Sequence, residues 1–271
     1  MTSSTQTGEL MRDRIQREKD FHEKTFSEDG RHSTLKYYDT ARSSIEFFKE
    51  FLVLNCAGGE VLEYGCGMGS QAPLLAKHGA KWITGIDIAN VAIEQVGQLA
   101  RAAGIENVTF KMMNAENLEF ADDSFDLVYG TGILHHLDLE KAYAELSRAL
   151  KPSGKAIFRE PLGYNPFINF YRRLTPRLRT EDEHPLLLST LEIAKRHFHR
   201  VETHYFHFFS LGAVFFRKTK LFPHVLGVLD KIDGLIFRVA PLRKYAWMVV
   251  IILAEPKQAE VGITRAQKTR E

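Results

Sequence analysis

The chain has 271 residues, 44% of them hydrophobic, which is enough to bury the core of one domain with a cap. A formal net charge of +2 disfavours a whole-molecule attraction to nucleic acid, and two cysteines are too few for a disulfide framework. The first 20 residues lack the apolar stretch of a secretory signal, and the longest apolar run, residues 245–254, is about half of a membrane span. We therefore expect a cytoplasmic protein.

Residues 1–44 are predicted to form an arm or lid. Dense charges between residues 9 and 24 are typical either of a solvated terminal helix or of an arm that docks on another surface. Tyr37 and Tyr38 supply aromatic surface that would close over a bound substrate. The arm is also a candidate contact between two copies of the chain.

A nucleotide site is predicted at the end of the first strand. The sequence there reads E-V-L-E-Y-G-C-G-M-G-S, in which an apolar run ends at Tyr64 and three alternate glycines follow. A helical pattern opens at Gln71, so a buried strand passes through a tight turn into a helix. Glycines let the backbone approach a ligand closely, and the start of the helix leaves unpaired N–H groups near it.

An acidic residue closes the second strand, Ile83 to Ile88. Asp87 lies where an acid binds the ribose hydroxyls in nucleotide-binding folds of this order, although it would also suit a helix cap. A dinucleotide fingerprint requires Gly or Ala at the sixth place of the glycine motif, and Ser70 stands there instead. The spacing therefore disfavours a nicotinamide cofactor.

Helices and strands alternate along the next part of the chain. Helical patterns cover residues 71–78, 91–103 and 139–150, and strand patterns cover 108–112, 125–130 and 155–159. This alternation predicts an α/β fold with a Rossmann-like parallel sheet and helices on both faces. Strands at 201–209 and 245–254, the final one antiparallel, complete a predicted domain of residues 45–255, with helical cap insertions at about 163–200 and 211–243 and a flexible tail at 256–271.

Five segments resemble the class I S-adenosylmethionine-dependent methyltransferases. They read V-L-E-Y-G-C-G-M-G at 61–69, T-G-I-D-I-A at 84–89, N-A-E-N-L-E-F at 114–120, F-D-L-V-Y-G-T-G-I-L-H-H-L at 125–137 and L-K-P-S-G-K-A at 150–156. The resemblance covers roughly residues 47–161 and implies S-adenosyl-L-methionine as the cofactor. It also implies which residues would bind that cofactor: Glu63, Gly65, Gly67, Asp87, Ile88, Asn114, Ala115, Glu116, Gly130 and Thr131.

The resemblance assigns these residues to different parts of the cofactor. Glu63 and the first two glycines would line the methionine part, Asp87 would bind both ribose hydroxyls, and Gly130 and Thr131 would approach the sulfonium. Ile88 and residues 114–116 would surround the adenine, where the family often has Asp in place of Asn114. Glu63 would equally suit a structural anchor for the glycine turn, since carboxylates commonly accept hydrogen bonds from loop N–H groups.

Three titratable residues are expected at the carboxyl edge of the sheet, where open α/β sheets bind ligands. His135 and His136 follow the fourth strand, and histidine is suited to general-base catalysis. His136 is the first candidate for a base, although the family carries the pair with many substrates, which also fits a role in shaping the loop. Glu160, at the end of the fifth strand, would hold or deprotonate an acceptor, or hydrogen-bond to the cap.

The first cap is aromatic and basic, and it contributes the candidate substrate residues Tyr171, Arg173 and His184. Arginine beside aromatic side chains holds an anionic group next to an apolar body, or lies on an anionic membrane; a solvated helix face is the alternative. Ser189 and Glu192 have the spacing of a capping box, which predicts a helix to about residue 198. No metal is expected, because no zinc pattern fits the spacing of His197, His199, His204 and His207.

These features favour methyl transfer to the oxygen, nitrogen or carbon of a small, largely apolar acceptor, such as a lipid, an isoprenoid or a polyketide-like molecule. No nucleic-acid partner is expected, and the cap is compatible with peripheral membrane contact. Three alternatives stay open: an RNA methyltransferase, which would need a basic face; a non-catalytic nucleotide-binding module on the same fold; and a nicotinamide-dependent oxidoreductase.

Overall fold

The computed structural model describes residues 14–21, 23, 39–175 and 185–257. Its centre is a seven-stranded sheet with the strand order β3-β2-β1-β4-β5-β7-β6. β1 to β5 pair in parallel, and β7 runs antiparallel to both β5 and β6, which confirms the predicted Rossmann-like sheet with a final antiparallel strand. The strands are β1 (Glu60–Tyr64), β2 (Trp82–Asp87), β3 (Val108–Met112), β4 (Phe125–Thr131), β5 (Leu150–Pro161), β6 (Phe198–Phe206) and β7 (Met248–Pro256).

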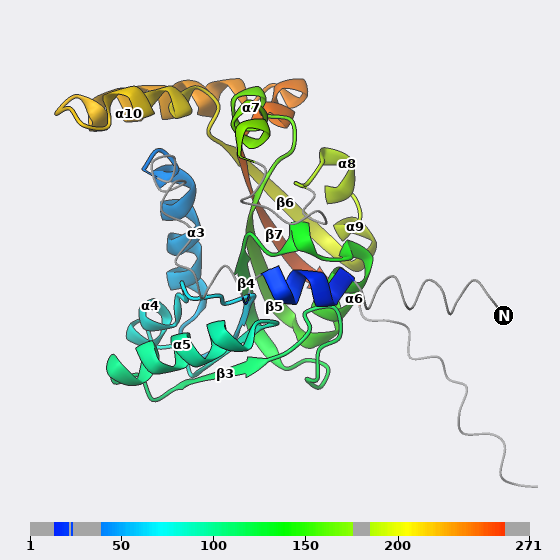
Figure 1. Cartoon of the computed structure of the whole chain (residues 1–271). Helices are drawn as coiled ribbons and strands as arrows, with labels where there is room; N and C mark the ends of the chain where they lie inside the picture. The colour runs from blue at the N-terminus through cyan, green and yellow to red at the C-terminus, as the bar shows by residue number, and fades with distance from the viewer. Residues whose placement is uncertain (1–13, 22, 24–38, 176–184, 258–271) are drawn as a thin grey trace, which may run out of the picture.

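Helices cover both faces of the sheet, as Figure 1 shows. One face carries α3 (Arg42–Asn55), α4 (Ala72–Lys77) and α5 (Asn90–Ala102), and the other carries α6 (Leu139–Ala149) and α9 (Ala194–His197). Successive residues of a strand point to opposite faces, so Val61 joins the buried cluster under α3 and α4, and Leu62 joins the cluster under α6. Burial on both sides explains why most residues of the central strands are apolar.

Four predicted segments differ from the structure in their bounds, and one of them is β7, which begins at Met248 and not at residue 245. β5 begins at Leu150 and not at residue 155, because a register shift between Phe125 and Leu127 of β4 places residues 152–154 inside the strand. β6 covers 198–206 and not 201–209. The single helix predicted from Ser189 to about residue 198 is wrong: two short helices, α8 (Leu188–Leu191) and α9, occupy this segment, and α8 is capped by the Thr190 hydroxyl, which accepts from the N–H of Leu187 at 3.1 Å.

The cap is formed by two insertions in the chain, and both leave the sheet at its carboxyl edge. α7 (Pro166–Leu174) and α8 follow β5, while η3 (Phe209–Phe216), α10 (Phe222–Ile236) and η4 (Ala240–Tyr245) connect β6 to β7. Figure 1 shows α7 and α10 gathered at one end of the molecule. Within the described ranges, no helix combines the length and apolarity needed to cross a membrane. The described cap is thus a layer of helices above the ends of β5 and β6 and the start of β7.

Candidate functional site

The glycine turn after β1 is fastened to the end of β2 by Asp87. One oxygen of this carboxylate accepts from the N–H of Gly67 at 2.8 Å, and the other accepts from the N–H of Ala89 at 3.0 Å. Gly65 and Gly67 have φ angles of +73° and +48°, in the left-handed region that favours glycine. A carboxylate oxygen can accept more than one hydrogen bond. Asp87 therefore retains acceptor capacity for the hydroxyls of a ribose.

Glu63 anchors the other side of the same turn. Its carboxylate accepts from the Ser70 hydroxyl and from the N–H of Gln71, the latter at 3.0 Å, and it lies beside the Tyr129 hydroxyl. Burial raises the pKa of Glu63 to about 7, so its neutral form persists in the folded protein at mildly acidic pH. A cation bound next to this carboxyl would favour its ionised form. The anchoring role that the sequence allowed is therefore observed.

The loop after β4 packs directly against the glycine turn. A Cβ atom at Gly65 would lie 2.8 Å from the Ile133 side chain, and a Cβ atom at Gly130 would lie 2.7 Å from the carbonyl oxygen of Tyr64 and 2.8 Å from Ile133. Both glycines are thus needed for packing between the two loops. Thr131, the next residue, is exposed.

The residues expected around an adenine lie at the same edge. The N–H of Met113 donates to the carbonyl oxygen of Asp87 at 2.9 Å, which joins the end of β3 to the end of β2. The side-chain oxygen of Asn114 accepts from the N–H of Glu116 at 2.9 Å, and the Tyr64 hydroxyl donates to the carbonyl oxygen of Ala115. Ile88 is half-buried beside Asp87. Asn114 therefore stabilises the turn to which Ala115 and Glu116 belong.

Glu160 clamps the loop that carries the two histidines, η1 (Leu134–His136). One of its oxygens accepts from the N–H groups of Ile133 and Leu134 at 2.9 and 3.1 Å, and the other lies 2.7 Å from Nδ1 of His135. The Glu160 side chain is fully buried, so it positions His135 and does not itself face solvent. Nδ1 of His136 lies 3.1 Å from a carboxylate oxygen of Glu18.

The described part of the arm, residues 14–21 and 23, lies across the carboxyl edge. Arg14 pairs with Glu116 and donates to the carbonyl oxygen of His136 at 2.6 Å. Glu23 accepts from the N–H groups of Asn90 and Val91, at 2.8 and 3.2 Å, and so caps the start of α5. The sequence predicted an arm but not its docking place, because nothing in a charged helix specifies which loops its acids and arginines will reach.

The candidate substrate residues are only partly described. On α7, Tyr171 is half-buried and Arg173 is exposed, while Tyr37, Tyr38 and His184 lie outside the described residues. Among the residues that the structure places, no three His, Cys, Asp or Glu side chains gather as a metal site requires.

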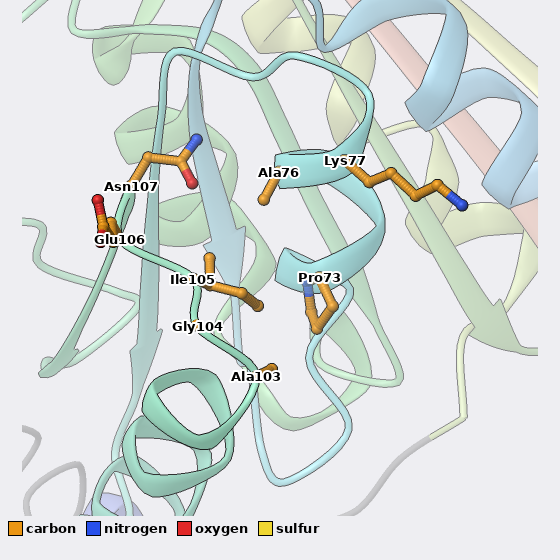
Figure 2. A pocket seen from close by; sticks show the side chains of 8 residues that line it. All are labelled: Pro73, Ala76, Lys77, Ala103, Gly104, Ile105, Glu106 and Asn107. Carbon is orange, nitrogen blue, oxygen red and sulfur yellow. The ribbon is translucent and has the colours of Figure 1, made fainter.

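A hollow of about 410 Å³ lies elsewhere, between α4 and the connection from α5 to β3 (Figure 2). Pro73, Ala76 and Lys77 line one side of it, and residues 103–107 line the other. This connection precedes β3 and therefore lies at the amino edge of the sheet, so the hollow is separate from the candidate site.

Comparison with known proteins agrees with the fold. Residues 61–154 match the family described as a methyltransferase domain. The chain is 33% identical over 101 residues to the 27-O-demethylrifamycin SV methyltransferase of Amycolatopsis mediterranei, covering 36% of this chain and 37% of that protein. It is 36% identical over 99 residues to the sterol 24-C-methyltransferase ERG6A of Gibberella zeae, covering 36% and 26%. The crystal structure of the PH0226 protein from Pyrococcus horikoshii OT3 superposes with a TM-score of 0.53 at 22% identity, over 80% of this chain and 91% of that one.

The fold and the site therefore define an α/β domain in which Asp87 and Glu63 hold a glycine turn at the carboxyl edge of the sheet. Residues 61–154 match the methyltransferase domain family, which agrees with the resemblance of the five sequence segments to the class I S-adenosylmethionine-dependent methyltransferases. The matched segments span between 26% and 47% of the length of the curated relatives.

Gly65 and Gly69 offer a matched test of the glycine turn. Gly65→Ala is expected to lower the free energy of unfolding by about 1–3 kcal/mol, because it strains a left-handed residue and crowds Ile133. Gly69→Ala should change it by less than about 0.5 kcal/mol, since a Cβ atom there meets nothing within 4 Å. Urea unfolding of both variants measures the difference, and equal losses would contradict the described packing.

The docking of the arm predicts how fast a ligand exchanges. Replacing both Arg14 and Glu23 by Ala removes contacts to the carboxyl edge, so dissociation of bound S-adenosylhomocysteine should accelerate about five- to tenfold. Displacement of radiolabelled ligand measures this rate. Asp20→Asn is the control, because Asp20 is exposed on the same helix and accepts from Gln16 of that helix. An unchanged rate in the double variant would show that the arm does not gate the site.

Proposed function

We propose that the protein transfers the methyl group of S-adenosylmethionine to the oxygen, nitrogen or carbon of a small, largely apolar acceptor. The observation that carries the proposal is the Asp87 carboxylate at the end of β2, which holds the N–H of Gly67 and keeps acceptor capacity for ribose hydroxyls. The names of the two relatives above, a rifamycin and a sterol methyltransferase, support an acceptor that is a small and largely apolar molecule.

The residues at the carboxyl edge fit this cofactor. Glu63 offers a buried carboxyl to a cationic amino group, Asp87 offers its oxygens to the ribose, and Ile88 offers a half-buried apolar side chain to the adenine. Residues 114–116, Gly65, Gly67, Gly130 and Thr131 belong to the same proposed site. S-adenosylmethionine supplies a methyl group on a positively charged sulfur, which is open to attack by a nucleophile.

His135 is the proposed base, with Glu160 as its positioning residue. A neutral imidazole that donates its Nδ1–H to Glu160 carries its lone pair on Nε2, which can take the proton of a hydroxyl or carbon acid. This arrangement favours His135 over His136, the first candidate from the sequence, whose Nδ1 faces Glu18 of the arm. The remaining chemistry is alignment and exclusion of water, which the arm and the cap would supply.

The surroundings of the protein form part of the same proposal. A cytoplasmic location is supported by Cys56 and Cys66, which are both buried thiols without a disulfide. Contact with a membrane is supported by the apolar acceptor, which would partition into lipid.

Five residues remain proposed substrate contacts: Tyr37, Tyr38, Tyr171, Arg173 and His184. The arm docks on its own chain through Arg14 and Glu23, so a contact between copies would use its other surfaces.

The most direct experiment incubates the protein with S-adenosylmethionine labelled on the methyl group and with fractionated cell extract, and then identifies the labelled product. A labelled small apolar molecule is the expected result. Labelled RNA would assign the rival RNA methyltransferase activity, and cofactor binding without any labelled product would assign a non-catalytic module.

Asp87→Asn should raise the Kd for S-adenosylhomocysteine about 10- to 100-fold, because hydrogen bonds to a charged acceptor are lost. Asp126→Asn is the matched control. Asp126 also accepts a backbone N–H, from Glu60 at 2.9 Å, but it lies at the amino edge and pairs with Lys151. The affinity of the Asp126→Asn variant for S-adenosylhomocysteine should stay unchanged. Isothermal titration calorimetry measures both values, and equal affinities for the two variants would contradict the proposed ribose site.

Glu160→Gln tests the assignment of the base for a hydroxyl or carbon acid acceptor. The amide oxygen can still accept from residues 133 and 134, but its NH₂ group faces Nδ1 of His135 and favours the opposite tautomer. The expected result is a loss of kcat of about 100-fold or more, with an unchanged cofactor Kd and an altered pH profile. His136→Gln, the control, should change kcat by less than about fivefold. The reverse ranking would assign the base to His136.

A further inference from the structure

The cap exposes many large apolar side chains. We name this exposed surface the cap face and define it by the exposed side chains of α7, η3, α10 and η4. Phe170 is 65% exposed, Phe215 is 87% exposed, and Leu221, Val228 and Leu235 of the α10 region are 61%, 58% and 59% exposed. Several large apolar side chains gathered at one end of a molecule indicate an interaction surface, whereas single ones do not.

α10 contributes a continuous stripe to the cap face. Leu221, Val228, Ile232, Leu235 and Val239 are separated by seven, four, three and four residues, so they lie on one side of the helix and its flanking residues. The opposite side is buried through Leu226, Asp233 and Phe237, which have the same helical spacing. Apolar residues therefore lie on both sides of the helix, and the outer stripe is the exposed one.

The outward orientation is fixed by a buried carboxylate. Asp233 accepts from the N–H groups of Phe208, Phe209 and Ser210, at distances between 2.7 and 3.0 Å. Ser43 of α3 additionally donates to Asp230 at 3.3 Å. These hydrogen bonds hold the side of α10 that carries Asp230 and Asp233 against η3 and α3, so the helix cannot turn its outer stripe inward without losing them.

Cations accompany the apolar stripe. Residues 209–245 contain seven Lys and Arg but only two acids, Asp230 and Asp233, and both acids face the interior contacts described above. Lys231 and Arg238 are exposed between the apolar residues of the stripe. A helix with an apolar face and flanking basic residues suits the boundary between acyl chains and anionic headgroups. At 15 residues, α10 is long enough to lie on a bilayer but too short to cross it.

We propose that the cap face docks on the surface of an anionic lipid bilayer. A symmetric contact between two copies is less favourable, because it would bring the cations of the stripe against the same cations of the other copy. The cap connects directly to the ends of β5, β6 and β7 at the carboxyl edge, so docking would place the candidate site near the lipid. This last consequence, delivery of an apolar acceptor from the bilayer, rests on the proposed function, whereas docking does not.

Co-sedimentation of the full chain with sucrose-loaded vesicles tests the proposal. Vesicles of phosphatidylcholine with 30% phosphatidylglycerol are expected to bind the protein, more weakly in 0.5 M than in 0.1 M NaCl, and pure phosphatidylcholine vesicles should bind it less. Leu235→Glu should reduce the partition coefficient at least about tenfold, because it places a charge in the acyl region. Leu99→Glu on α5, where Leu99 is also 59% exposed, should leave it unchanged.

A second pair of variants tests the electrostatic part. Lys231→Gln and Arg238→Gln should each reduce binding to anionic vesicles about fivefold. Arg101→Gln, an exposed arginine on α5, is the control. Thermal unfolding confirms that each variant is folded.

Three outcomes would overturn the docking proposal. They are absence of binding to anionic vesicles, equal losses in Leu235→Glu and Leu99→Glu, and a lipid-free dimer in analytical ultracentrifugation that Leu235→Glu dissociates. The assay contains neither cofactor nor acceptor, so vesicle binding by a protein that transfers no methyl group would leave docking intact and refute the proposed function alone.

Discussion

Three buried or half-buried carboxylates at or near strand ends hold the functional edge of this protein together. Glu63 of β1, Asp87 of β2 and Glu160 of β5 each accept hydrogen bonds from backbone N–H groups of a loop that follows β1, β2 or β4. Loops at the carboxyl edge have no ladder partners of their own, so these acids satisfy donors that would otherwise be buried without acceptors. The same three residues are also candidates for binding or catalysis, because ionisable groups at this edge are close to any bound ligand.

Much of the fold follows from the sequence, because the alternation of apolar strands and amphipathic helices is a local property. The strand that ends at Asp87 and the glycine turn that ends at Ser70 are both found where their patterns place them. The extent of β5 was not predictable, since residues 152–154 look like a turn and join the strand only through a register shift against β4. The double short helix at 188–197 was missed because the capping hydroxyl belongs to Thr190, whereas the spacing suggested Ser189.

The candidate site was predictable in its residue types but not in its partnerships. The sequence placed His135, His136 and Glu160 at one edge, yet only the fold shows that Glu160 binds His135 while His136 faces the arm. The sequence also predicted that Gly130 contacts a ligand, whereas the structure shows that a side chain at this position would collide with neighbouring residues. Contacts between residues far apart in the chain depend on the geometry of the sheet, which periodicity alone does not encode.

Ile133 connects two loops of the carboxyl edge mechanically. Its side chain occupies the space that two different glycines leave open, one in the turn after β1 and one at the end of β4. A tightly packed side chain transmits displacement because interiors resist compression. The glycine turn after β1 and the loop that carries the histidines are therefore coupled through the side chain of Ile133. A displacement of either loop would displace the other.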